Sequence, residues 1–190
     1  AAGLLPDPIW KRSRLREPWF PGDTVNLSIG HGYLLVTPLQ VACMVAAIAN
    51  GGVWYPPRLI RGYEINNRLV LAYPPAHGEF LPLTAGTLPL VQQGMWEVVN
   101  HPLGSGRLAA VPGLTVAGKT GSAQTPAQTY GWFVGYAPFH QPTIALAVLV
   151  EHADTGGKDA APIARDALAA YFNIDISRHA NHVGITTFSD

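Results

Sequence analysis

A Lys-Thr-Gly triplet, Lys119-Thr120-Gly121, constrains this chain more than any other stretch. Small and β-branched residues precede it and Ser122 follows it, a pattern that predicts a β-strand from about residue 115 to residue 124. Alternate side chains of a strand share a face, so we expect Lys119 and Gly121 on one side and Thr120 and Ser122 on the other. Glycine at this position would let a ligand backbone lie close against the strand.

The triplet alone is a weak signal, and an ordinary edge strand with a surface lysine is the alternative interpretation. The residues that follow favour a sheet. Residues 130–137 and 143–151 are predicted to be two further strands joined by a turn at 138–142, and Pro162 is predicted to open a helix that ends near residue 172. Strands joined by short links pair antiparallel. The expected fold class is therefore α+β, with helices flanking an antiparallel sheet.

The first half of the chain predicts two helices and a hairpin. Thr37 and Pro38 are start signals for an apolar core helix that reaches Ala49 and ends at Asn50-Gly51-Gly52. A second helix is predicted from residue 88 to residue 100. The remaining predictions are strands at 54–63 and 68–72 around an Asn66-Asn67 turn, an extended loop at 1–24, and a flexible tail at 173–190.

The loop predicted at residues 1–24 carries four basic residues between Lys11 and Arg16, which we interpret as a solvated edge, with a functional basic patch as the alternative. The whole chain is 48% hydrophobic and 13% charged with zero net charge, which favours packing against more protein and gives no support for a nucleic-acid partner. No apolar run reaches the roughly 18 residues of a membrane helix. The first residues also lack the features of a signal peptide, so any anchor or address is expected outside this chain.

Metal and cofactor chemistry finds little support in the composition. The single cysteine, Cys43, excludes an internal disulfide and a thiolate cluster, and a buried inert thiol is favoured over a reactive one. Seven histidines show no metal-binding spacing, so we expect neither a metal nor a cofactor. His31 lies between glycines and is interpreted as a turn residue, with a position near a cleft as the alternative. Core positions are expected for the aromatics Trp132, Phe133 and Tyr136, and loop positions for Glu151 and Asp154.

Three segments together resemble the transpeptidase domain of class B penicillin-binding proteins, in particular those of cell elongation. They are residues 22–33, where glutamine is more usual at the place of His31, residues 37–52, and residues 117–124 with 132–138 downstream. The resemblance covers roughly residues 15–172. It implies the C-terminal portion of a domain of the penicillin-binding-protein and serine β-lactamase type, whose third signature is the Lys-Thr-Gly strand.

The first two signatures of that family are missing from this chain. It contains neither Ser-x-x-Lys nor Ser-x-Asn, and Thr155-Gly156-Gly157-Lys158, which has the first spacing with a threonine, is interpreted as a coincidence. The family carries its nucleophile N-terminal to the segments matched here. Residues 1–172 are therefore expected to be the C-terminal part of one transpeptidase domain, with the nucleophile-bearing part as a partner outside this chain. The isolated chain is expected to be inactive.

The resemblance also implies an activity, that of a peptidoglycan D,D-transpeptidase that cross-links stem peptides through a serine acyl-enzyme and is a target of β-lactams. Catalytic roles then fall to Lys119, as positive potential beside the nucleophile, and to Ser122, whose N–H would complete an oxyanion hole. The substrate-binding residues would be Lys119, Thr120, Gly121, Ser122 and Gln124.

The partners implied by the resemblance are stem peptides, β-lactams and a membrane glycosyltransferase reached through regions outside this chain. The implied location is the periplasmic, extracytoplasmic face of the bacterial cell membrane. A serine β-lactamase, and a penicillin-recognising sensor or non-catalytic scaffold module, are the alternatives.

Overall fold

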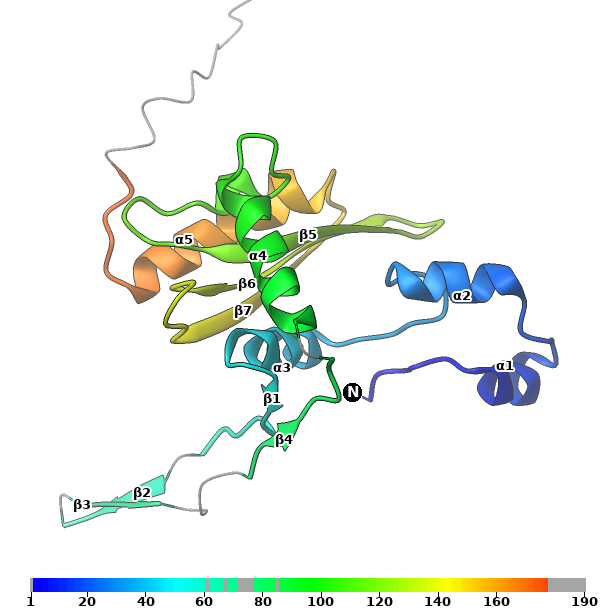
Figure 1. The fold of residues 1–190 in the computed structure, drawn as a ribbon, viewed down its shortest axis with the longest axis horizontal. Helices are drawn as coiled ribbons and strands as arrows, with labels where there is room; N and C mark the ends of the chain where they lie inside the picture. Colours follow the sequence, from blue (N-terminus) through cyan, green and yellow to red (C-terminus); the bar gives the residue numbers. More distant parts are fainter. Residues whose placement is uncertain (1, 61, 67, 72–76, 85, 178–190) are drawn as a thin grey trace, which may run out of the picture.

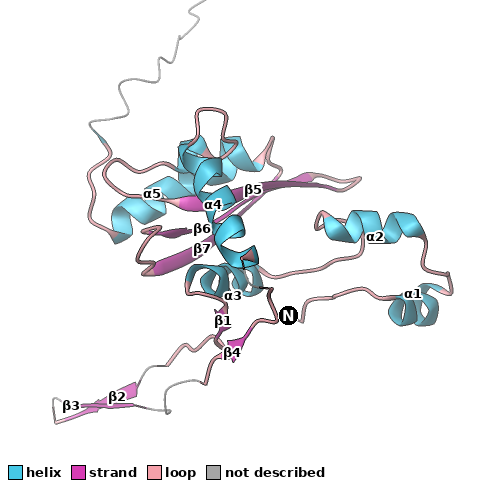
Figure 2. Ribbon diagram, in the orientation of Figure 1, coloured by secondary structure: helices cyan, strands magenta, loops and turns pink. Residues whose placement is uncertain are grey.

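The computed structural model describes residues 2–60, 62–66, 68–71, 77–84 and 86–177. Figures 1 and 2 show a three-stranded sheet with helices on both faces and with two smaller arms leaving it. The elements in chain order are α1 (Pro8–Leu15), α2 (Pro21–Ser28), α3 (Pro38–Ala49), β1 (Val53–Trp54), β2 (Gly62–Ile65), β3 (Arg68–Leu71), β4 (Glu79–Phe80), α4 (Thr87–Asn100), the 3₁₀ turn η1 (Arg107–Ala109), β5 (Ala117–Gln124), β6 (Thr129–Ala137), β7 (Ile144–Glu151), the π-helix η2 (Gly156–Ala160) and α5 (Ala161–Tyr171).

The central sheet has the order β5-β6-β7, and both of its pairings are antiparallel. The three strands and the α+β class predicted from the sequence are confirmed. The signature strand β5 is an outer strand, because it pairs with β6 on one side only. This places the Lys-Thr-Gly triplet at an edge of the sheet rather than in its middle.

Each face of the sheet has its own apolar core. Fully buried Phe133 of β6 packs with Ala164 and Leu168 of α5 on one face. Fully buried Tyr136 packs with Val45 of α3 and Met95 of α4 on the other. Phe133 and Tyr136 are thus core residues, as predicted, and burial raises the pKa of the Tyr136 hydroxyl. The third aromatic, Trp132, is only half-buried.

The predicted helices α3 and α4 are confirmed. Thr37 and Gln40 form a reciprocal capping box at the start of α3, which satisfies two backbone N–H groups there. Along α3 only Val45 and Ala47 are buried, while Leu39 and Met44 are about half exposed at 58% and 50%. The helix is therefore less enclosed than its apolar sequence suggested, because nothing in the described part of the chain covers its outer side.

The prediction of an extended loop at residues 1–24 is wrong, because this region contains α1 and the first half of α2. Asp7 caps α1 by accepting the N–H of Trp10, and proline occupies the first turn of both helices. In α2, Asp23 accepts the N–H of Phe20. These are ordinary start signals, and the density of prolines and aromatics in this region masked them.

Lys11 also corrects the prediction of a solvated basic edge, since only 2% of its surface is exposed. Its Nζ lies 2.7 Å from Asp23 Oδ2 and 4.7 Å from the centre of the Phe20 ring. The hydrogen bond with Asp23 raises the pKa of Lys11, and the same bond lowers the pKa of Asp23. Lys11 therefore ties α1 to α2, whereas Arg12, Arg14 and Arg16 are exposed as expected.

The predicted strand 54–63 is split into β1 and β2, because Pro56 and Pro57 interrupt it. β1 pairs with β4, while β2 and β3 form the predicted hairpin, whose last pair joins Ile65 to Arg68 across the turn. The second turn residue, Asn67, lies outside the described residues. Of the predicted tail, Ile174 and Ile176 pack against the core beside α5, and residues 178–190 lie outside the described part.

Many large apolar side chains are exposed in the described residues, among them Ile9 at 79%, Phe80 at 83% and Leu90 at 76%. Burying such side chains against more protein would be favourable, in keeping with the packing expected from the composition. No described helix is long and apolar enough to span a bilayer.

Candidate active site

The site predicted from the sequence lies on β5, at the open edge of the sheet. The hairpin between β5 and β6 closes with a hydrogen bond from the Thr125 N–H to the Gln128 carbonyl. Hydrogen-bonded pairs alternate along an antiparallel ladder, so the register of β5 and β6 turns the N–H and C=O groups of Thr120 and Ser122 away from β6. The backbone N–H of Ser122 is therefore directed to the side where a ligand strand or a developing oxyanion can meet it.

The side chains of the signature divide between the two faces, as expected. Lys119 is paired with Val134 and Gly121 with Trp132, which places both on the face covered by α3. Thr120 and Ser122 lie on the face covered by α5 and η2.

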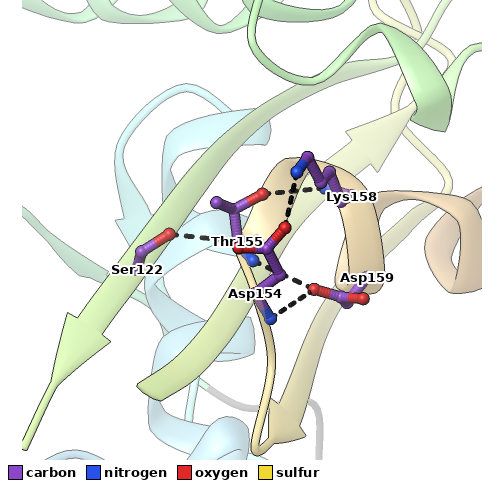
Figure 3. A network of polar contacts seen from close by, with 6 residues as sticks. Ser122, Asp154, Thr155, Lys158 and Asp159 are labelled. Carbon is purple, nitrogen blue, oxygen red and sulfur yellow. Dashed lines mark hydrogen bonds and ion pairs between the residues drawn. The ribbon is translucent and has the colours of Figure 1, made fainter.

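Two hydrogen bonds fix the hydroxyls on the α5 face. Ser105 Oγ and Thr120 Oγ1 are 2.7 Å apart. Ser122 Oγ accepts the N–H of Gly156 at 3.2 Å, a contact that Figure 3 shows beside the network of Asp154, Thr155, Lys158 and Asp159. Both hydroxyls still have hydrogen-bonding capacity, since a hydroxyl can donate once and accept twice. They present two adjacent oxygens at the open edge of β5.

The network in Figure 3 holds the segment that contacts Ser122. Asp159 Oδ2 accepts the N–H groups of Asp154 at 2.8 Å and Thr155 at 3.0 Å, and Thr155 Oγ1 accepts the N–H of Lys158 at 3.2 Å. Lys158 Nζ pairs with Asp154 Oδ2 at 2.5 Å, and this hydrogen bond raises the pKa of Lys158. These bonds cap the start of η2 and keep Gly156 against the sheet. Asp154 is thus a loop carboxylate, as predicted, whereas Glu151 is not, because it is the last residue of β7 and pairs with Tyr130.

On the α3 face, β5 borders an apolar groove of about 340 Å³. Lys119 reaches it from β5, Trp132 and Val134 from β6, and Val41 and Met44 from α3. The ammonium of Lys119 is exposed and donates to the Thr120 carbonyl at 2.5 Å. A positive group that borders a largely apolar groove is well placed to attract a negatively charged group that enters there.

A second hollow, of about 400 Å³, lies next to that groove near the end of β5. Gln124 lines it, and His31 lines both hollows. His31 is a turn residue, as predicted: its N–H donates to the Asn26 carbonyl at 2.8 Å, and its Nδ1 lies 3.3 Å from the Ile29 carbonyl. It also lies near the cleft, where its role stays a prediction. All five residues predicted for the site border one or the other hollow: Lys119, Thr120, Gly121 and Ser122 the first, and Gln124 the second.

Sequence reasoning missed Ser105 and dismissed the Thr155–Lys158 segment, although both contact the signature strand. Gly156 approaches β5 so closely that a side chain at its position would meet the backbone of Gly121 and Trp132. Two successive glycines were the available signal for this close approach. Within the described residues no three His, Cys, Asp or Glu side chains are grouped so that they could hold a metal ion.

The edge strand β5, with its lysine, two hydroxyls and outward N–H, has the features expected for the third signature of penicillin-binding proteins. The family model for the penicillin-binding protein transpeptidase domain matches residues 6–169, and the chain belongs to this family. The resemblance in sequence and the expected transpeptidase-domain fold are confirmed.

Individual relatives give the same result. The chain is 32% identical over 189 residues to the peptidoglycan D,D-transpeptidase MrdA of Haemophilus influenzae, covering 90% of this chain and 29% of that protein. The Pseudomonas aeruginosa PBP2 structure in complex with WCK 5153 matches with a TM-score of 0.76 and 36% identity, over 90% of this chain and 38% of the other.

A Helicobacter pylori PBP2 structure, solved as a complex with MreC, matches with a TM-score of 0.70 and 31% identity, over 90% of this chain and 31% of the other. The present chain thus spans less than two fifths of each of these three relatives.

Proposed function

We propose that this chain supplies the signature strand of a peptidoglycan D,D-transpeptidase, and that residues 1–172 complete a transpeptidase domain whose nucleophilic serine lies in another part of the protein. The observation that carries the proposal is the open edge of β5. It presents Lys119, the hydroxyls of Thr120 and Ser122, and the outward N–H of Ser122 at one place. Family membership and the D,D-transpeptidase relative of H. influenzae support it.

Each group has a defined part in this proposal. The terminal carboxylate of the donor peptide is held by the hydroxyls of Thr120 and Ser122, with Lys119 adding positive charge near the nucleophile. Gly121 lets the peptide lie along β5, and Gln124 lines the hollow that continues along the strand. The N–H of Ser122 stabilises the oxyanion that forms when the serine attacks the carbonyl carbon. The products of this step are an acyl-enzyme and a free D-amino acid.

The test is acylation of the complete protein by a fluorescent penicillin. We expect a stable covalent adduct, because β-lactams imitate the donor peptide and leave the serine acylated. Absence of labelling in the folded protein would favour a non-catalytic scaffold, and rapid turnover of penicillin would identify a β-lactamase instead. Stable labelling without transfer to any amine would favour a penicillin-recognising sensor.

Replacing Ser122 with alanine should slow penicillin acylation by roughly 10- to 100-fold, because one charge-assisted hydrogen bond to the ligand carboxylate is lost while the backbone N–H remains. The comparison is Ser122→Thr, which keeps the hydroxyl and should retain most of the rate. Acylation rates measured over a range of penicillin concentrations give the result. Equal rates for the alanine and threonine variants would remove Ser122 from the proposed carboxylate site.

The complete protein is proposed to work at the periplasmic, extracytoplasmic face of the cell membrane with an elongation glycosyltransferase as partner, reached through regions outside this chain. The Helicobacter pylori PBP2 complexed with MreC supports a place in a larger assembly. The exposed apolar side chains of the described residues are consistent with such contacts.

A further inference from the structure

A third hollow, of about 630 Å³, lies on the α5 face beyond Thr120. The end of α4, the η1 turn and the start of η2 form its walls. We call it the Arg107 hollow. Its volume is in the range of ligand-binding sites. The residues that line it and matter for the argument are Asn100, Ser105, Arg107, Leu108, Thr155 and Lys158.

The Arg107 hollow is suited to an anion. Two cationic side chains, Arg107 and Lys158, line it, and no carboxylate is among the described residues that do. Because Lys158 is already paired with Asp154 beside the hollow, Arg107 is the cation on which the argument rests. Arg107 donates from Nη1 to the Pro102 carbonyl at 3.1 Å, which steadies a guanidinium that carries five N–H donors in all. Lys158 is held at the rim by Asp154. The planar fork of an arginine fits a carboxylate in a bidentate manner.

The hollow also lies next to the position proposed for the leaving group of the acylation step. Thr120 and Ser122 hold the terminal carboxylate in the proposed function, and this carboxylate belongs to the residue that leaves after acylation. Ser105, which lines the hollow, is hydrogen-bonded to Thr120 at 2.7 Å. The departing amine therefore leaves next to the Arg107 hollow. Acyl transfer to a second amine is the chemical reverse of that departure, so the incoming amine approaches by the same side.

We infer that the Arg107 hollow is the acceptor subsite, binding the body of an anionic peptide whose free amine attacks the acyl-enzyme. The inference rests on the proposed function. In the step itself the amine nitrogen forms an amide bond with the acyl carbon, the ester bond to the serine oxygen breaks, and the proton of the amine goes to that oxygen. Arg107 holds a carboxylate of the acceptor peptide, and Ser105 lies between it and the reacting centre.

The experiment measures the two half-reactions separately in the complete protein. A thioester analogue of a D-Ala-D-Ala donor peptide is supplied with either a dicarboxylate acceptor peptide or free D-alanine. D-Alanine fills the Thr120 position and does not reach the hollow. In Arg107→Glu, we expect transfer to the acidic peptide to fall at least about tenfold, because a charge-assisted contact is replaced by repulsion. Transfer to D-alanine and acylation by penicillin should stay near those of the unsubstituted protein.

Arg165→Gln is the matched control, because this arginine lies on α5 away from the hollow and pairs with its neighbour Asp166. Should Arg107→Glu fail to fold, Arg107→Gln removes the charge without reversing it and should lower the same transfer selectively. Unchanged transfer to the acidic peptide in these variants overturns the inference, as does an equal loss with both acceptors. A complete protein that penicillin does not acylate would overturn the proposed function first, and the inference with it.

Discussion

Alanine at position 119 is expected to lower penicillin acylation of the complete protein by about 100-fold or more, because a preorganised positive group is removed from the place where negative charge develops. Lys119 is suited to this role by its position. It lines an apolar groove together with Trp132 and Met44, beside the open edge of β5 where the ligand is proposed to bind. A quenched time course of labelling with a fluorescent penicillin gives the acylation rate directly.

The substitution should leave the fold intact, which makes the loss of rate interpretable. The Lys119 side chain is exposed, and its ammonium donates a hydrogen bond to the carbonyl of the next residue. The thermal unfolding midpoint should therefore match that of the unsubstituted protein, and Arg165→Ala should change neither property. Near-normal labelling by a folded Lys119→Ala protein would refute the role assigned to this lysine.

Local patterns were sufficient to predict the sheet and the helices beside it. The register of β5 against β6 follows from strand alternation, and the start of α3 follows from a capping hydroxyl and a proline. The same kind of signal is present at Asp7-Pro8 but is outweighed by the surrounding aromatics, so the sequence predicts a loop where α1 and the first half of α2 lie. The helix-start signals were therefore present in this region, but they received too little weight against its prolines and aromatics.

The surroundings of the site could not be predicted in the same way, because they come from distant parts of the chain. Ser105 meets Thr120 across 15 residues, and Gly156 meets Ser122 across 34. No periodicity records either pairing. Lys11 illustrates the same limit, since a lysine in a basic run gives no sign that Asp23 will fold back to neutralise it. Motifs thus predicted the candidate residues on β5, whereas only the fold showed which distant residues contact them.

The signature strand depends on the segment that packs against it, and Gly156 is the point of closest contact. Gly156→Ala is therefore expected to impair both stability and activity. A Cβ at this position would overlap the backbone carbonyl oxygens of Gly121 and Trp132. Backbone atoms within a sheet cannot rotate away as a side-chain end can, so η2 has to lift from β5. Overpacking of this kind costs about 1–3 kcal/mol. The lift also withdraws the N–H that Ser122 accepts, and shifts of about 1 Å at a reacting site lower rates by up to about 100-fold.

The matched control is Gly94→Ala in α4, where no atom lies within 4 Å of the added Cβ. Alanine in a helix interior is favoured over glycine by about 1 kcal/mol, so this variant should be as stable as the unsubstituted protein or slightly more so. Thermal midpoints and penicillin acylation rates of both variants, measured in the complete protein, decide the matter. If Gly156→Ala behaved like Gly94→Ala in both measurements, the contact between η2 and the signature strand would not position Ser122. The hydroxyl would then have to be held by groups outside this chain.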